Sequence, residues 1–230
     1  MRELIRAIVG HRADKPQFLN PHVERLHRTY LERLRDPETR DEIRNKLRKA
    51  LEKDRKANEN GGETATYSRR RITYSISDYG VDIHRHIREL LETRDKVHIL
   101  DLGAGDGNYL ALLKHFFGNR VHTTAMGLTT TPQLKHKLEK GAIDRIIQRS
   151  LEGFTPDREY DLIVSYWGGL HYVTQGLEFQ YAEMLAHSLS KGGRLIIYPY
   201  HGELRNIKDL RFRIKVEKYI ENVAVVTKIG

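Results

Sequence analysis

The chain has 230 residues, 39% of them hydrophobic, and carries a formal net charge of +9. Its length suits one domain of about 150 residues plus an extension. The absence of cysteine excludes disulfides, a cysteine nucleophile and thiolate metal sites, and it favours a cytoplasmic location. No apolar run approaches the ~20 residues of a membrane span, and the first residues lack the apolar core of a signal peptide.

The positive charge is concentrated at the start of the chain, because residues 1–75 carry +7 of the +9. A basic segment beside a nearly neutral domain is typical of a protein with a phosphate-rich partner such as RNA. A charge-laced helical surface exposed to solvent would give the same composition. The charge pattern alone leaves both interpretations open.

Two helices are predicted in this basic part. Asn20-Pro21 is a helix start with proline at the first helical position, and Asp36-Pro37 repeats the signal. The second helix is expected to run to about Lys56 and to stop before Gly61-Gly62. The apolar stripes of both helices are narrow and have no partner in the sequence, which leaves open a role as a dimerisation arm. The first stripe comprises Val23, Leu26, Tyr30, Leu31 and Leu34.

The polar, glycine-bearing stretch 58–65 is the predicted linker. We therefore expect a basic helical extension at 1–65 and a second domain at 66–230. Directly after the linker, the three arginines 69–71 lie among tyrosines. Basic residues interleaved with aromatic ones can bind a nucleic acid through phosphate contacts and stacking. The same segment could instead cover a substrate or simply connect the two parts.

A strand, a glycine turn and a helix follow one another at 97–117. Residues 97–102 form a short apolar run, as expected of a buried strand, and apolar residues recur at helical spacing from Leu110. Between them stand Gly103, Gly105 and Gly107. Glycine lets the backbone turn sharply and approach a ligand, and the following helix points free N–H groups at it. The dinucleotide fingerprint fails, because its third glycine would fall at Asn108.

The rest of the chain alternates strands and helices. After the amphipathic helix at 81–91 and the glycine turn, strands are predicted at 120–128, 143–148, 161–165 and 194–199. Helices are predicted at 132–139 and 180–189. This alternation indicates a parallel sheet covered on both faces. The last two strands, 211–219 and 222–228, are joined by a tight turn and should form an antiparallel hairpin.

The pattern Asp101-x-Gly103-x-Gly105-x-Gly107 at a strand end resembles motif I of the class I S-adenosylmethionine (SAM)-dependent methyltransferases. The resemblance covers residues 78–230. It implies an α/β fold of the Rossmann-like, doubly wound type, with a seven-stranded sheet that ends in an antiparallel hairpin. It also implies SAM as the cofactor.

The resemblance assigns the cofactor site to the strand ends, where such sheets bind ligands. The glycines would let the methionine part of SAM approach, and Asp101 would orient its ammonium group. The acid that usually holds the ribose is replaced by Thr129, and the acid that usually meets the adenine amino group is replaced by Ser150, with Glu152 two residues further on. The implied cofactor residues are Asp101, Gly103, Ala104, Gly105, Gly107, Asn108, Thr129, Ser150, Leu151 and Ser165.

The stretch 165–172 occupies the motif IV position and is similar to the loop of small-molecule methyltransferases. The implied catalytic candidates are Tyr166, Trp167 and His171. Trp167 would stack on the acceptor, and His171 could remove a proton from a hydroxyl or amine. A helix cap or a core position is the alternative for His171. Tyr198 and Tyr200 would complete an aromatic pocket or cover the edge of the sheet.

The sequence therefore predicts a SAM-dependent methyltransferase that acts on an oxygen or nitrogen nucleophile, with a small molecule favoured as acceptor. An RNA acceptor held by the basic N-terminal third is the alternative. A non-catalytic module that binds RNA or a protein partner is a second alternative, because two acids of the family pattern are missing. The 12 histidines are scattered without acids at ligand spacing, so we expect no metal site.

Overall fold

The computed structural model describes residues 83–166, 169–173, 177–198, 211–218 and 222–230, single positions 200, 204 and 207, and parts of 21–52. The predicted boundary at 58–65 and the arginine-rich segment that follows it lie outside these residues. Within 21–52, the described residues up to Glu32 and again from Pro37 are helical. The second helix begins as predicted, since the backbone N–H of Thr39 donates to Asp36 Oδ2 at 2.9 Å.

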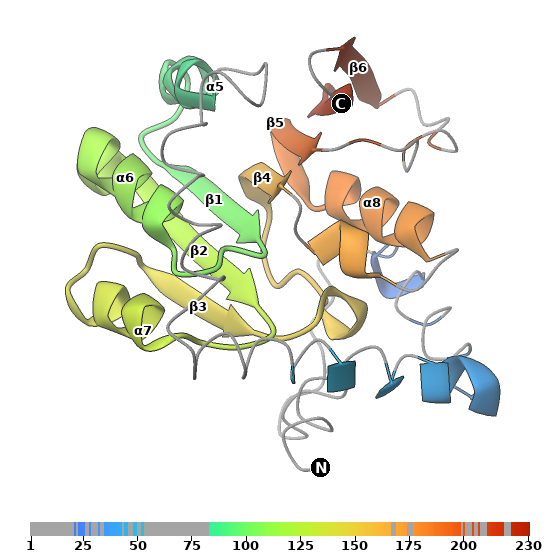
Figure 1. The fold of residues 1–230 in the computed structure, drawn as a ribbon. Helices are drawn as coiled ribbons and strands as arrows, with labels where there is room; N and C mark the ends of the chain where they lie inside the picture. Colours follow the sequence, from blue (N-terminus) through green and yellow to red (C-terminus); the bar gives the residue numbers. More distant parts are fainter. Residues whose placement is uncertain are drawn as a thin grey trace.

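Seven strands form one sheet in the order β3-β2-β1-β4-β5-β7-β6 (Figure 1). Strands β1 to β5 are parallel, and β7 runs antiparallel to both β5 and β6. The predicted Rossmann-like sheet with a terminal antiparallel hairpin is confirmed. The strands are β1 (Val97–Leu102), β2 (Val121–Gly127), β3 (Arg145–Gln148), β4 (Tyr160–Tyr166), β5 (Leu189–Tyr198), β6 (Phe212–Lys218) and β7 (Asn222–Lys228).

Helices cover both faces of the sheet, as the doubly wound fold requires (Figure 1). One face is covered by α5 (Ile83–Leu91), α6 (Asn108–Phe117) and α7 (Pro132–Glu139), and the other by α8 (Glu178–His187). The described residues also include three short 3-10 helices: η1 (Gly118–Arg120), η2 (Leu151–Gly153) and η3 (Gly169–Tyr172). None of the described helices is long and apolar enough to cross a membrane.

Helix α7 shows how the local sequence sets an element boundary. The Thr131 side chain accepts a hydrogen bond from the backbone N–H of Leu134 at 3.1 Å. Pro132 then occupies the first helical position, where a missing N–H costs nothing. This helix therefore begins and ends at the predicted residues.

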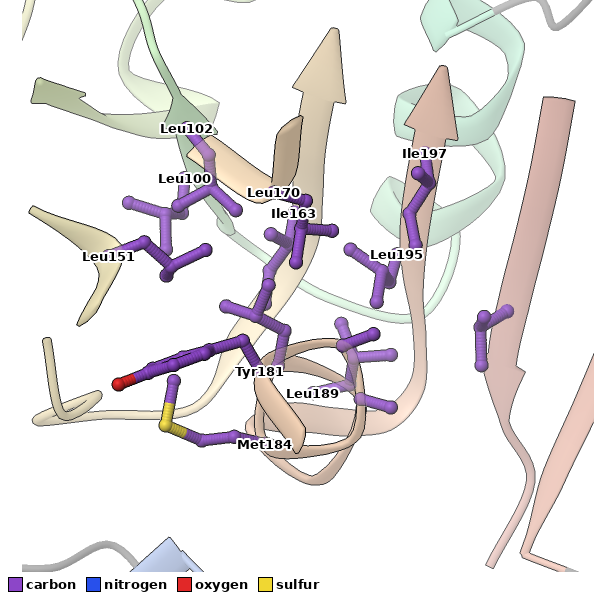
Figure 2. Close-up of a cluster of buried hydrophobic side chains, with 14 of the residues drawn as sticks. Leu100, Leu102, Leu151, Ile163, Leu170, Tyr181, Met184, Leu189, Leu195 and Ile197 are labelled. Atoms are coloured by element: carbon purple, nitrogen blue, oxygen red, sulfur yellow. The ribbon is translucent and has the colours of Figure 1, made fainter. Parts of the chain in front are cut away.

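Each face of the sheet has its own hydrophobic core. The core on the α8 side includes Leu100, Ile163, Leu195 and Tyr181, whose side chains gather between the strands and the helix (Figure 2). Val23 from the N-terminal part is fully buried in the same core. Val23, a residue of the apolar stripe predicted for the first helix, therefore packs on the α8 side of the sheet.

Strand β5 starts earlier than the sequence predicts. The strand predicted at 194–199 begins at Leu189, and residues 190–193 form an irregularity inside it, because the pairing with β4 shifts between Tyr160 and Leu162. Gly192 has a φ of 75°, and a Cβ on Gly193 would lie 2.8 Å from the backbone oxygen of Ser190. The glycine pair thus allows a bulge, and the strand continues back to Leu189.

A buried carboxylate links three strands near their amino ends. Asp161 at the start of β4 accepts hydrogen bonds from the backbone N–H of His98 at 2.7 Å and from Ser190 Oγ at 2.5 Å. It also pairs with Arg94 at 2.5 Å, and Arg94 in turn donates to the backbone oxygen of Lys191. Asp161 therefore joins β1, β4 and β5 through one side chain.

The histidines of β1 and β2 make the stability depend on pH. Burial, as the main cause, lowers the pKa of both His98 and His122 below its ordinary value. The unfolded chain therefore binds more protons than the folded protein, and its stability should fall as the pH drops below about 6.5. Thermal melts at neutral and mildly acidic pH test this expectation. The loss should shrink in His98→Asn/His122→Asn and remain in the control His136→Asn, whose residue is exposed.

Candidate functional site

The carboxyl ends of β1 to β5 meet at one edge of the sheet. Along the strand order, the chain leaves β1 toward β2 and β3 on one side and toward β4 and β5 on the other. Ligands of open α/β sheets bind at such a reversal point, outside the carboxyl ends of the strands. The candidate site therefore lies outside the carboxyl ends of the neighbouring strands β1 and β4, where both the glycine turn and the loop after β4 start.

The glycine turn after β1 has the backbone shape that the sequence predicted. Gly103, Gly105 and Gly107 have φ values of 83°, 56° and 70°, a region that residues with a Cβ rarely adopt. The backbone N–H groups of Gly103 and Ala104 donate to the oxygen of Met126 at 2.8 and 3.1 Å, which fixes the turn to the end of β2. The turn is thus held by the backbone and presents little side-chain bulk.

Helix α6 begins directly behind this turn. Gly107 is its N-cap, no side chain caps the helix, and Asn108 is its first residue. The first N–H groups of α6 therefore have no capping side chain and lie beside the end of β1. A Cβ on Gly107 would come within 2.6 Å of Leu134 Cδ1, so a larger residue at this position would force the Leu134 side chain of α7 to move.

Two carboxylates are buried at the turn. Asp101, the last residue but one of β1, is 1% exposed, and Asp106 between the second and third glycines is 4% exposed. A carboxylate accepts hydrogen bonds and donates none, so Asp101 can receive an ammonium group at the strand end. Asp106 was not among the predicted site residues, because an aspartate in a glycine-rich turn is common for local reasons.

The second and third strand ends carry hydroxyl and amide groups where the family pattern has acids. Thr129 is partly exposed after β2. Its neighbour Thr130 donates to Gln148 Oε1 at 3.0 Å, a link between the ends of β2 and β3 that the sequence analysis missed. No spacing rule connects these two residues, so only the register of the sheet reveals the pair.

Ser150 lies at the predicted place, but its side chain has a local task. Its Oγ accepts the backbone N–H of Glu152 at 3.2 Å and so caps η2. Glu152 is 2% exposed, and its backbone oxygen accepts the hydroxyl of Tyr181 at 2.8 Å. The structure thus buries a carboxylate two residues beyond the position where the family pattern has one, next to the buried Leu151.

The loop after β4 closes over the end of β1. A Cβ on Gly169 would lie 3.4 Å from Leu151 Cδ2 and 3.5 Å from Leu102 Cβ. Figure 2 shows Leu102, Leu151 and Leu170 gathered at this point. The Ser165 hydroxyl is buried beneath, and it has no hydrogen-bond partner among the described residues.

The catalytic candidates are placed only in part. Tyr166 ends β4 and stacks on Tyr198 at the end of β5, with ring centroids 4.9 Å apart and planes inclined by 8°. Trp167 lies outside the described residues. The backbone of His171 belongs to η3, and nothing further is described of this residue. An aromatic pair at the ends of β4 and β5 is therefore established, whereas the arrangement of the three candidates is not.

No group of three or more His, Asp or Glu side chains that could hold a metal ion occurs in the described part of the chain. The edge instead offers backbone N–H groups, the buried carboxylates of Asp101 and Glu152, and hydroxyl groups. This set suits a polar organic cofactor with a cationic group. Carboxylates can accept hydrogen bonds from such a group, and glycines leave room for it.

No protein-family model matches the chain, and no curated protein matches it. Among solved structures, it is similar to a Clostridium thermocellum protein described as a candidate rRNA methylase. The identity is 15%, the TM-score is 0.49, and the match covers 64% of this chain and 96% of the other.

Two further similar structures are methyltransferases by description. A TehB-like SAM-dependent methyltransferase from Corynebacterium glutamicum is 17% identical, with a TM-score of 0.48 and coverage of 73% and 98%. The 1,6-didemethyltoxoflavin-N1-methyltransferase of Burkholderia thailandensis, solved with S-adenosylhomocysteine, is 15% identical, with a TM-score of 0.46 and coverage of 72% and 89%.

These likenesses concern the fold, and at such identities they say nothing about the acceptor. The topology observed here stands independently of them. Five parallel strands are followed by a hairpin whose last strand, β7, lies between β5 and β6 and alone runs against the others. With the glycine turn at the end of β1, this chain has the fold of the class I SAM-dependent methyltransferases.

Proposed function

We propose that this protein is a SAM-dependent methyltransferase that transfers a methyl group to an oxygen or nitrogen nucleophile of a small molecule. The observation that carries the proposal is the turn after β1. It combines three left-handed glycines, an uncapped helix start and the buried carboxylate of Asp101. A structural turn alone requires neither a buried carboxylate nor three glycines in the left-handed region.

The described residues fit this cofactor. The glycine turn leaves room for the methionine part, and the Asp101 carboxylate would accept hydrogen bonds from its ammonium group. Thr129 and the Thr130–Gln148 pair would contact the ribose at the end of β2. Glu152 would supply the acid that Ser150 lacks near the adenine. When bound, SAM supplies a methyl group activated by its positively charged sulfur.

The protein's own part in the reaction is to hold the acceptor in line with that methyl group and exclude water. The Tyr166–Tyr198 pair would form one wall of the acceptor site. The loop at Gly169 packs closely on Leu102 and Leu151. The similarity of 165–172 to the loop of small-molecule methyltransferases favours a small acceptor over a polynucleotide. His171 would take the proton of the nucleophile as it is methylated.

The cofactor site can be tested by calorimetry with SAM and S-adenosylhomocysteine on the full chain. Asp101→Asn should weaken binding by about tenfold or more, because a charge-assisted hydrogen bond is lost. The matched control is Asp95→Asn, an exposed aspartate at the opposite end of the same strand. Equal affinity of both variants, or no binding at millimolar cofactor, would contradict the proposed site.

The acceptor is tested separately with SAM that carries a labelled methyl group. Label is expected in small molecules when the protein is incubated with metabolite and RNA pools. Label in RNA alone would overturn the small-molecule acceptor and support the RNA alternative. Cofactor binding without any labelled product from either pool would indicate a non-catalytic module.

A further inference from the structure

An aromatic cluster lies on the surface where α5 meets the end of α6 (Figure 1). Phe116, in the last turn of α6, is 61% exposed, the highest value for a large hydrophobic side chain in the described part of the chain. Its ring centroid lies 5.2 Å from that of His84 on α5 and 5.7 Å from that of His115. The ring of His84 also lies 5.6 Å from that of Phe117. Four rings therefore gather here, and one of them is left largely open to solvent.

The hydrophobic core accounts for Phe117 but not for Phe116. Phe117 is partly buried and packs on the core beneath α5 and α6. Phe116 is the next residue toward the helix start, and most of its surface is in contact with water. A lone exposed apolar side chain is ordinary, whereas a contiguous group of exposed rings is typical of an interaction surface. The aromatic cluster therefore indicates a place where a partner binds.

Arginines border the aromatic cluster. Arg88 is exposed and lies one turn beyond His84 on the same side of α5. Arg120 of η1 is also exposed, and its guanidinium donates to the backbone oxygen of Leu91 at 2.9 Å, which places it at the end of α5. Arg85 is 59% exposed on the same helix. A partner that covers the rings would thus lie against several positive charges.

Few acids oppose these charges. Within α5, α6 and η1, the lysines and arginines number four and the single acid is Glu89. Glu89 forms an ion pair of 2.6 Å with Arg194 of β5, and this contact is the main reason that its pKa lies below its ordinary value. Glu92 is exposed directly after α5, where its backbone N–H donates to the oxygen of Arg88. The surface therefore carries a net positive charge, with Glu92 at its border.

Open rings beside arginines match a single-stranded nucleic acid. Its unpaired bases can stack on an exposed aromatic side chain, and its phosphates can bind the neighbouring arginines. A duplex keeps its bases stacked on one another, and a membrane surface requires an apolar helix face rather than rings among imidazoles. Loops and ends of RNA are single-stranded in their ordinary state. The segment before α5 has the same composition, with arginines 69–71 among tyrosines.

We infer that this surface binds single-stranded RNA, with a base stacked on Phe116 and phosphates held by the arginines. The surface comprises His84, Arg88, His115, Phe116 and Arg120. It lies at the C-terminal end of α6, whereas the glycine turn of the cofactor site lies at the N-terminal end. The RNA is thus a partner bound away from the cofactor site, and the inference does not depend on the proposed methyl transfer.

Fluorescence anisotropy of the full chain with a labelled RNA strand tests the inference. A strand of about 12 nucleotides is within the range that single-strand binders cover. We expect saturable binding that weakens as salt is added, because counterions are released from the phosphates. The same strand annealed to its complement should bind about fivefold or more weakly, since its bases are no longer free to stack.

The decisive variant is Phe116→Leu, which keeps an apolar side chain and removes the ring. It should weaken the binding of the single strand by about tenfold, the usual effect of losing one stacked base. Phe116→Tyr keeps a ring and should bind within about twofold of the parent protein. The matched control is Leu138→Ala on α7, which alters another exposed apolar side chain, 39% exposed, and should leave RNA binding unchanged.

Two charge variants should act in opposite directions. Arg88→Gln should weaken binding and lower the slope of log affinity against log salt by about 0.7, the contribution of one phosphate contact. Glu92→Gln should strengthen binding, because it removes the negative charge at the border of the surface. Lys135→Gln, on an exposed lysine of α7, is the control for a general change in charge and should have a smaller effect than Arg88→Gln.

Thermal melts serve as the folding control, and all these variants should melt as the parent protein does, because the altered side chains are exposed. The inference is overturned if the single strand does not bind saturably, if the duplex binds as tightly, or if Phe116→Leu binds RNA as the parent protein does. A parent protein that sediments as a dimer and a Phe116→Leu variant that sediments as a monomer would instead assign the surface to a second copy of the chain.

Discussion

Gly107→Ala is expected to lower the free energy of unfolding by about 2–4 kcal/mol, the sum of a left-handed backbone and an overpacked contact. Gly107 has a φ of 70°, and an added Cβ would lie 2.6 Å from Leu134 Cδ1. The buried Leu134 side chain, or α6 and α7 with it, would have to shift. Because α6 begins at the glycine turn, the shift should also weaken cofactor binding.

Gly141→Ala is the matched control for this effect. Gly141 also has a left-handed backbone, with a φ of 68°, but no atom lies within 4 Å of an added Cβ. It should therefore cost only about 1 kcal/mol and leave cofactor affinity unchanged. Chemical denaturation of both variants separates backbone strain from the clash. Equal losses in the two variants would show that α7 yields freely and that the close approach is unimportant.

Asp161→Ala should destabilise the protein by about 3–5 kcal/mol, because it leaves buried donors and a cation without their acceptor. Arg94, Ser190 and the backbone N–H of His98 all donate to this carboxylate. The stability of Asp161→Asn should lie between that of the parent protein and that of Asp161→Ala. The asparagine amide oxygen can still accept the backbone N–H of His98, but it cannot form an ion pair with Arg94. Thermal melts should show a fall of about 10 °C for the alanine variant.

The control for Asp161 is a second aspartate–arginine pair nearby. Asp157 binds Arg145 at 2.7 Å, but the two side chains are 44% and 33% exposed. Asp157→Ala should cost less than about 1 kcal/mol, as is usual for exposed pairs. If Asp161→Ala also lost less than about 1 kcal/mol of stability, backbone and core contacts alone would be holding the amino ends of the three strands together.

The sequence predicts elements well where one local cause decides them. Thr131 and Pro132 start α7 through a cap and a fixed φ, so its bounds are right. The alternation of apolar runs and turns likewise gives all seven strands, because each strand is short and bounded. The start of β5 is missed, since glycines 192 and 193 usually mark a turn and here form a bulge held by pairing with β4.

The candidate site was predictable to the extent that it depends on one segment. The glycine turn and Asp101 are contiguous, so their spacing carries the signal. The Thr130–Gln148 link and the approach of Gly169 to Leu151 join separate segments, and only the sheet register brings them together.

The position of β7 between β5 and β6 governs the order in which the sheet can form during synthesis. β6 leaves the ribosome first, yet its only neighbour in the sheet is β7. Until β7 emerges, β6 has no strand to pair with and the edge of β5 stays open. An open edge is prone to pair with other chains. We therefore expect folding to be late and cooperative, with aggregation most pronounced in chains that stop between β6 and β7.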